Sequence, residues 1–285
     1  MAEIVTTQKK SEQFKNLIER YKPQIAVALP RHMDADRFAR MAINAAVSAP
    51  EILDCTPLSQ IGALMAAATL GLEPGVAGEC WILPFKDNKS GTTVATFIPG
   101  YRGLVQLCWR SNQVANIGAN AVYENDHFEY QEFPPKLVHR RASGDRGKLI
   151  AAYAYAKLKG GSDYQWEFLN AEDIAKIKKA SRGAASKFSP WNIADWEHWM
   201  WRKSAIRQLC KMLPMSVEMR VAIDHDERAD AGIPQNFDFN LDPAKEVKQP
   251  EPVGGNGDGK PQVDQETGEI ENAPKATKPA AGVMI

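Results

Sequence analysis

The run of residues 70–114 constrains the fold more than any other part of the chain. Gly71 follows an apolar helical segment, two apolar stretches then flank a polar turn at residues 86–91, and Gly100-Tyr101-Arg102-Gly103 follows the second stretch. A glycine directly after a periodic apolar segment ends a helix. Apolar stretches around a short polar turn are typical of a β-hairpin. The run therefore predicts a helix end, a hairpin and a short helix over residues 101–111.

Helices are expected before this run and after it. Ser11, Asp34 and the pair Thr56-Pro57 each precede apolar side chains at helical spacing, which predicts three N-terminal packing helices, the first over residues 11–21. Asn170 caps a predicted helix over residues 171–181. Two further helices are expected, over residues 191–213 and from Ser216 to residue 232.

Alternating or β-branched segments predict further strands over residues 114–123, 128–132, 149–158 and 164–169. The last two form a second hairpin around a Gly-rich turn at residues 159–163. The expected fold class is thus α+β: one domain over residues 1–232 with N-terminal helices, a β-hairpin-rich sheet and C-terminal basic helices. Residues 233–285 are rich in Pro and Gly and contain no Trp or Tyr, so they predict a flexible, disordered acidic tail.

Charge is divided unevenly along the chain, although the net charge is zero. Residues 1–223 carry 29 Lys and Arg against 22 Asp and Glu, whereas residues 224–285 carry 6 against 13. A basic body with an acidic tail is typical of a domain that binds a polyanion and carries an interaction segment. An ordinary body with a solubilising tail fits the composition equally well.

The predicted helix over residues 191–213 holds the strongest candidate contacts. Lys203, Arg207 and Lys211 lie four residues apart and line up on one face, with Trp196 on the same side. An extended single strand of nucleic acid needs cations for its phosphates and flat apolar surfaces for its bases. We expect the three cations to contact phosphates and Trp191 and Trp196 to stack on bases. A solvated helix face, with either tryptophan packed in the core, is the alternative.

Further cations are candidates for phosphate contacts. Lys178, Lys179 and Lys187 flank a Gly- and Ser-containing segment at residues 183–186, whose backbone can approach a phosphate closely. Arg102 lies at a strand-to-helix turn, where the first amides of a helix donate to anions. Solvated surface lysines and a tight turn with a surface arginine are the structural alternatives.

No motif indicates catalysis, a cofactor or a metal. The chain has no phosphate-binding loop followed by Ser or Thr, no Cys-x-x-Cys and no His-Glu-x-x-His. Glu124 and Asp126 form a loose carboxylate pair without a motif that joins them to a base. No segment predicts a membrane span or a signal peptide, and four scattered cysteines are typical of free thiols in a reducing cytoplasm. We therefore predict no catalytic residue and no cofactor.

Several motifs in one order carry a resemblance to a known family. They are Leu29-Pro30-Arg31-His32-Met33, the run over residues 70–114, and residues 191–213 with Lys203-Ser204-Ala205-Ile206-Arg207. Over roughly residues 26–228 the chain resembles the RecT-type single-strand annealing proteins of bacteriophage recombination systems. The resemblance implies ATP-independent binding of single-stranded DNA and annealing of complementary strands in homologous recombination, without bond-making chemistry.

The resemblance also implies partners. Family members work in the bacterial host cell on single strands and annealed duplex intermediates, as homo-oligomeric rings or helical filaments. A phage exonuclease and the host single-strand-binding protein are the protein partners it implies. A protein that only coats single strands, and a metal-dependent nuclease, are the alternative functions.

Overall fold

The computed structural model describes residues 2–75, 77–87, 90–181, 184–187, 189–214, 216–235 and 237. Helices and antiparallel sheets make the described chain a mixed α+β protein, as predicted. The expected tail lies outside the described residues from residue 238 onward.

The N-terminal part is helical and packs into a common core. Its elements are α1 (Ala2–Ala28), α2 (Ala35–Ser48), the short 3₁₀ helix η1 (Pro50–Asp54) and α3 (Pro57–Leu70). Two predicted helix ends are confirmed: the Asp34 carboxylate accepts from the Arg37 amide at 2.7 Å, and Gly71 ends α3 at a φ of 59°. The cap predicted at Ser11 is wrong, because Ser11 lies inside α1, and Thr56 precedes α3 without a side-chain cap hydrogen bond. Helix α1 is much longer than predicted and continues through Pro23. Ile18 and Ile25 are both buried on it, so core packing extends the helix past the proline.

The expected hairpin and short helix follow. Strands β1 (Cys80–Lys86) and β2 (Thr93–Pro99) pair in antiparallel fashion, and α4 spans Tyr101–Arg110. The glycines around Tyr101 and Arg102 allow a close approach. A Cβ at Gly100 would lie 2.0 Å from the Gly78 carbonyl oxygen, and one at Gly103 would lie 2.2 Å from that of Glu79. The Gly-Tyr-Arg-Gly sequence therefore presses the start of α4 onto the turn before β1.

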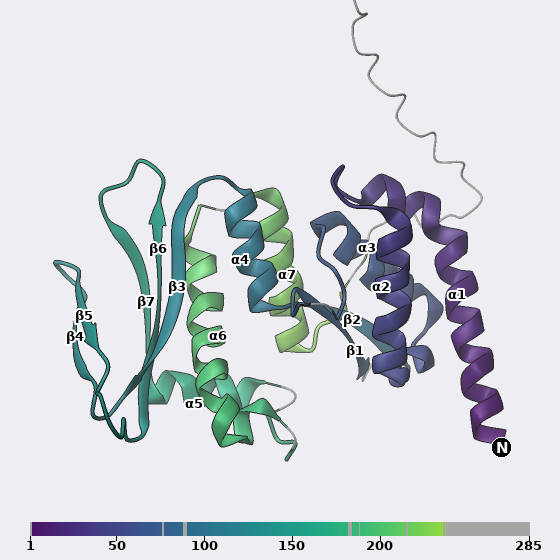
Figure 1. Ribbon diagram of the computed structural model, residues 1–285. Coiled ribbons are helices and arrows are strands. Elements are labelled where there is room, and N and C mark those ends of the chain that lie inside the picture. Colours follow the sequence, from purple (N-terminus) through teal and green to yellow (C-terminus); the bar gives the residue numbers. More distant parts are fainter. Residues whose placement is uncertain are drawn as a thin grey trace, which may run out of the picture. The chain divides into compact units, whose positions relative to one another are not determined.

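A three-stranded sheet forms the next layer. Its strands are β3 (Val114–Tyr123), β6 (Leu149–Leu158) and β7 (Tyr164–Asn170), in the order β3-β6-β7 and all antiparallel. Helix α6 (Ala194–Met212) packs along one face of this sheet (Figure 1). Buried Ala152, Ala154 and Ala156 on the central strand leave room for the helix.

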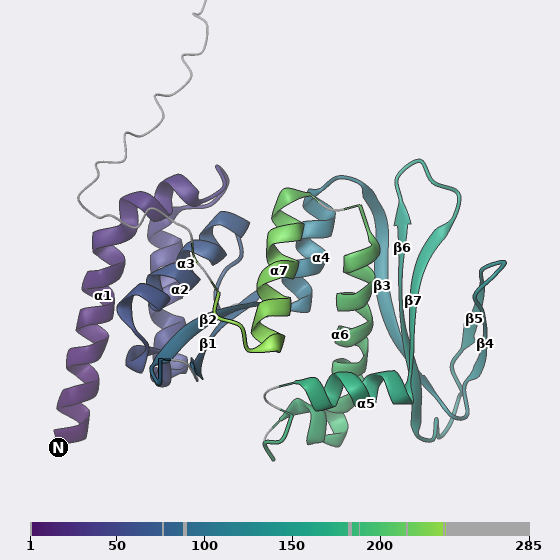
Figure 2. The same cartoon turned by 180° about the vertical axis from the view of Figure 1, so that it is seen from behind.

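A separate hairpin, β4 (His127–Gln131) with β5 (Lys136–Arg140), lies beside the opposite face of the sheet (Figure 2). Residues 136–140 were not predicted as a strand. They follow two prolines and carry a basic residue at each end, so only their pairing with β4 defines them.

The remaining helices are α5 (Ala171–Ala180), the 3₁₀ turn η2 (Pro190–Asn192) and α7 (Val217–Ala231). The caps predicted at Asn170 and Ser216 are confirmed. Trp191 was expected to open the long helix but lies in η2 ahead of it.

The chain stays attached to the body after α7. The Gln235 side chain donates to the Phe97 carbonyl at 2.7 Å and accepts from the Phe97 amide at 2.9 Å, and the Phe237 ring fills the space over Gly62. We therefore propose that the folded body reaches Phe237, beyond the boundary at 232 predicted from the sequence.

Candidate nucleic-acid interface

A hollow of about 430 Å³ lies where the turn before β1, the start of α4 and the first half of α6 meet. We call it the tryptophan hollow. Three predicted contacts line it: Arg102 from the strand-to-helix turn, and Trp196 and Lys203 from the basic helix. The complete lining is Ala77, Gly78, Trp81, Gly100, Tyr101, Arg102, Pro190, Trp196, Trp199, Met200 and Lys203.

Three indoles of the hollow remain accessible to solvent. Trp81, Trp196 and Trp199 are 44%, 58% and 44% exposed. The guanidinium of Arg202 lies 4.5 Å from the centre of the Trp199 ring, and its Nε donates to a β3 carbonyl at 2.9 Å. Trp199 is therefore held against the sheet while part of its surface stays open. Such rings offer flat apolar surfaces on which unpaired bases can stack.

Two cations complete the hollow. The Arg102 guanidinium donates to the Ala77 carbonyl at 3.0 Å and to the Tyr101 hydroxyl at 3.3 Å. Within the described ranges, neither Arg102 nor Lys203 forms an ion pair. Burial, together with the positive charge of Arg207, lowers the pKa of Lys203. An anion bound in the hollow would stabilise both charges, and the first amides of α4 lie at the same rim.

The other two cations of the predicted row are engaged by α7. Arg207 donates to Asp226 and to Asp230, both at 2.6 Å, and Lys211 lies 2.9 Å from Glu227. The spacing on α6 was read correctly, but the acidic side chains of a second helix could not be placed opposite it from the sequence. The row therefore does not present three equivalent phosphate contacts.

The remaining predicted residues lie outside the hollow. Lys178 donates to the backbone carbonyl of Trp191 at 3.0 Å, and Trp191 is only 4% exposed. Trp191 thus packs in the core, which was the alternative to base stacking. Lys179 and Lys187 are exposed and form no ion pair with the described part of the chain.

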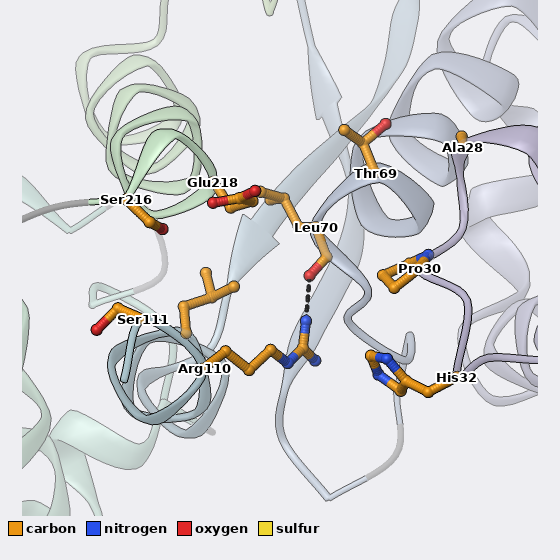
Figure 3. A pocket seen from close by; sticks show the side chains of 10 residues that line it. Ala28, Pro30, His32, Thr69, Leu70, Arg110, Ser111, Ser216 and Glu218 are labelled. Atoms are coloured by element: carbon orange, nitrogen blue, oxygen red, sulfur yellow. Dashed lines mark hydrogen bonds between the residues drawn. The ribbon is translucent and has the colours of Figure 1, made fainter. Parts of the chain in front are cut away.

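A second cavity, of about 350 Å³, lies between the ends of α3 and α4 and the start of α7 (Figure 3). Arg110 points from α4 toward the end of α3 and donates to the carbonyls of Leu70, at 2.7 Å, and Gly71. Its guanidinium therefore serves the last carbonyls of a helix, which need such donors. This cavity is the weaker candidate for an anion.

The acidic segment at residues 224–227 is dispersed by the helix that carries it. Asp224 pairs with Arg228, the His225 ring packs edge-on against Phe97, and Asp226 and Glu227 pair with α6. No group of three or more metal-ligating side chains is found in the described ranges. None of the helices described is long and apolar enough to cross a membrane.

Sequence reasoning missed Trp81, Tyr101 and Trp199. The sequence held a signal for Trp81. Side chains alternate along a strand, so Trp81 points to the face opposite that of Cys80 and Ile82, which are buried. Trp199 lies three residues after Trp196, which puts both on neighbouring positions of one helix face. What the sequence could not show is that β1 and α6 meet.

Comparison with known proteins identifies the family of this chain. The RecT family profile matches residues 36–239, a range that contains every residue of the tryptophan hollow. Protein RecT of Escherichia coli K12 is 38% identical over 211 residues, which cover 73% of this chain and 77% of that protein. The uncharacterized protein YqaK of Bacillus subtilis 168 is 28% identical over 173 residues, which cover 60% and 57%. The chain belongs to the RecT family and is a recombination and strand-annealing protein.

Proposed function

We propose that this protein binds single-stranded DNA in the tryptophan hollow and anneals complementary strands without ATP. Family membership supports the annealing role in homologous recombination. The observation that carries the binding site is the convergence, in one hollow, of three exposed indoles and two cations that form no ion pair with the described chain.

The chemistry of the hollow suits a single strand of any sequence. Trp81, Trp196 and Trp199 stack on bases, and stacking tolerates every base because each has a flat face. Arg102 and Lys203 bind phosphates. Strand annealing needs the repulsion between two phosphate backbones to be neutralised while base edges stay free to pair. No bond is made or broken, so the activity requires no catalytic residue.

Cations outside the hollow extend the proposal. Lys179 and Lys187 are exposed and continue the phosphate contacts near α5. Four other predicted residues stabilise the fold instead of contacting DNA, because contacts within the protein already hold them: Lys178, Trp191, Arg207 and Lys211.

Assembly and partners belong to the same proposal. Resemblance to the family supports a homo-oligomer, as a ring or helical filament, on single strands and the annealed duplex intermediate in the bacterial cytoplasm. A phage exonuclease would supply the single strands, and the host single-strand-binding protein would cover them.

The proposal is tested by annealing of a fluorophore-labelled and a quencher-labelled oligonucleotide, in EDTA and without nucleotide. We expect the full-length protein to accelerate quenching above the spontaneous rate. Binding without acceleration would favour the coating protein, and absence of binding at low salt would overturn the nucleic-acid proposal. Magnesium-dependent loss of labelled DNA would indicate the nuclease.

A matched pair of variants ties the activity to the hollow. Trp196→Ala should slow annealing and weaken binding, whereas Trp109→Ala should change neither. Trp109 is 46% exposed, comparable to the indoles of the hollow, but does not line it. Equal effects of the two substitutions would show that the hollow is not the contact.

A further inference from the structure

The face of the sheet that points away from α6 carries a second group of aromatic rings. Side chains alternate along a strand, so the alanines of β6 that meet α6 leave Tyr153, Tyr155 and Lys157 on the other face. On the neighbouring edge strand, β7, the same face carries Tyr164, Trp166 and Phe168.

The β4–β5 hairpin stacks on two of these five rings, Tyr153 and Phe168. The Tyr130 ring lies 4.4 Å from Phe168, and Phe128 stacks 5.8 Å from both Phe168 and Tyr153. Figures 1 and 2 show this hairpin beside β7, away from α6. The rest of the face forms what we call the outer platform. It consists of Tyr155, Tyr164, Trp166 and Lys157.

The rings of the outer platform form one continuous surface. The centre of Tyr164 lies 5.9 Å from that of Tyr155 and 5.4 Å from that of Trp166. Tyr164 is 37% exposed, and the other two are partly exposed. A Cβ at Gly118 would lie 2.8 Å from the Tyr155 ring, so the glycine lets this ring lie across β3. The platform therefore spans all three strands.

Two cations lie beside the rings on this face. The Lys157 ammonium lies 5.7 Å from the centre of the Tyr164 ring, and Arg141 donates to Asn120 on β3 at 3.1 Å. Neither cation forms an ion pair with a described residue. The one carboxylate on β6 and β7, that of Glu167, alternates onto the α6 side, where burial raises its pKa. Stacked rings with neighbouring cations complement bases and phosphates.

We propose that the outer platform is a second contact for single-stranded nucleic acid, separate from the tryptophan hollow. Bases stack on Tyr164 and Trp166 while phosphates meet Lys157 and Arg141. The hollow is lined by α6, which packs on the inner face of the sheet, so one protein molecule holds two separate segments of nucleic acid. The inference takes its ligand from the proposed function, but its contact residues are independent of the hollow.

Photocrosslinking tests the platform directly. The full-length protein is bound to an oligothymidylate that contains 5-iododeoxyuridine and is irradiated, and crosslinked peptides are identified by mass spectrometry. We expect crosslinks in the segments of Trp196 and Trp199 and also in residues 155–166. The variant Tyr164→Ala with Trp166→Ala should lose the second set, keep the first, and bind about fivefold or more weakly.

Controls separate the possible failures. Gln165→Ala should keep both sets of crosslinks, because Gln165 is exposed and lies between the two rings in sequence but on the opposite face of β7. Lys157→Glu is a second test in case removal of the two rings disturbs the fold. It leaves the rings in place and should also lose the second set of crosslinks. Crosslinks in the hollow alone would overturn this inference and leave the proposed function standing. A changed subunit assembly with unchanged crosslinks would make the platform a protein interface, and a wild-type protein that binds no DNA would overturn the proposed function itself.

Discussion

The two halves of α6 carry similar charges in different surroundings. In the first half, Lys203 lies beside Trp196 and Trp199 at the tryptophan hollow, without an ion pair among the described residues. In the second half, Arg207 and Lys211 meet carboxylates of α7. All three cations lie four residues apart, so spacing alone predicts the same role in phosphate binding for each of them. The helix that faces them decides which charge remains for a ligand.

The difference is sharpest at Arg207 and Asp226, whose carboxylate is almost completely buried. Arg207→Ala would leave this carboxylate without its partner. Breaking a buried ion pair in this way destabilises a fold by about 3–5 kcal/mol. We expect a loss of that size in the free energy of unfolding, measured by urea titration.

The same variant should leave DNA binding by the folded protein intact. Arg207 lowers the pKa of Lys203, so its removal favours the charged form of Lys203. A fall in affinity with unchanged unfolding would show that Arg207 contacts DNA after all.

The aromatic residues of α6 allow the opposite test. Replacing both Trp196 and Trp199 by Ala should lower the affinity for single strands by about 1–3 kcal/mol for each base that loses its stacking partner. Stability should change little, because both rings are exposed. Fluorescence anisotropy with a labelled oligothymidylate measures the affinity.

Trp201 is the control on the same helix. It is only 6% exposed, so Trp201→Ala should destabilise the fold by about 3–5 kcal/mol. Affinity per folded molecule should stay the same. If Trp201→Ala and the Trp196 and Trp199 double variant gave the same pattern, exposure would not separate binding from packing on α6.

Lys203 forms no ion pair with the described residues, so its removal should change the salt dependence of binding. Each phosphate neutralised on a single strand contributes about 0.7 to the slope of log affinity against log salt. Lys203→Ala should lower the slope by about this amount, whereas Lys203→Arg should keep it. An unchanged slope in Lys203→Ala would remove Lys203 from the phosphate contacts.

Alkaline pH should act on Lys203 in two opposite directions. Its pKa is lowered in the folded protein, mainly by burial, so between this value and the ordinary lysine value the unfolded chain binds more protons. This group therefore makes the free energy of unfolding rise with pH in that window, while loss of its charge weakens DNA binding. The difference between wild type and Lys203→Arg isolates both effects. Parallel changes in stability and affinity would contradict the assignment.

Local signals in the sequence predicted the elements well, because caps and turns depend on neighbouring residues. Asp34, Asn170 and Ser216 cap helices where expected, and Gly71 ends α3. The strand β5 was not predicted, because its pairing with β4, rather than its own residue pattern, defines it.

The candidate site could be predicted only in pieces. Arg102 and Lys203 were chosen from separate motifs, and the fold brings them to one hollow. The place of Trp81 depends on packing between distant elements. The ion pair of Arg207 with Asp226 also depends on packing between two helices, which the pattern of a single helix does not show.

The smallest effect is expected at the far end of α6. Lys211 and Glu227 are both partly exposed, and exposed ion pairs contribute about 0–1 kcal/mol to stability. Lys211→Ala should therefore change the free energy of unfolding by no more than this and leave the salt slope of DNA binding unchanged, because its charge is already balanced. A fall in the salt slope equal to that of Lys203→Ala would show that Lys211 leaves Glu227 and binds a phosphate in the complex. The basic row would then continue past the hollow, and the two halves of α6 would form one binding surface.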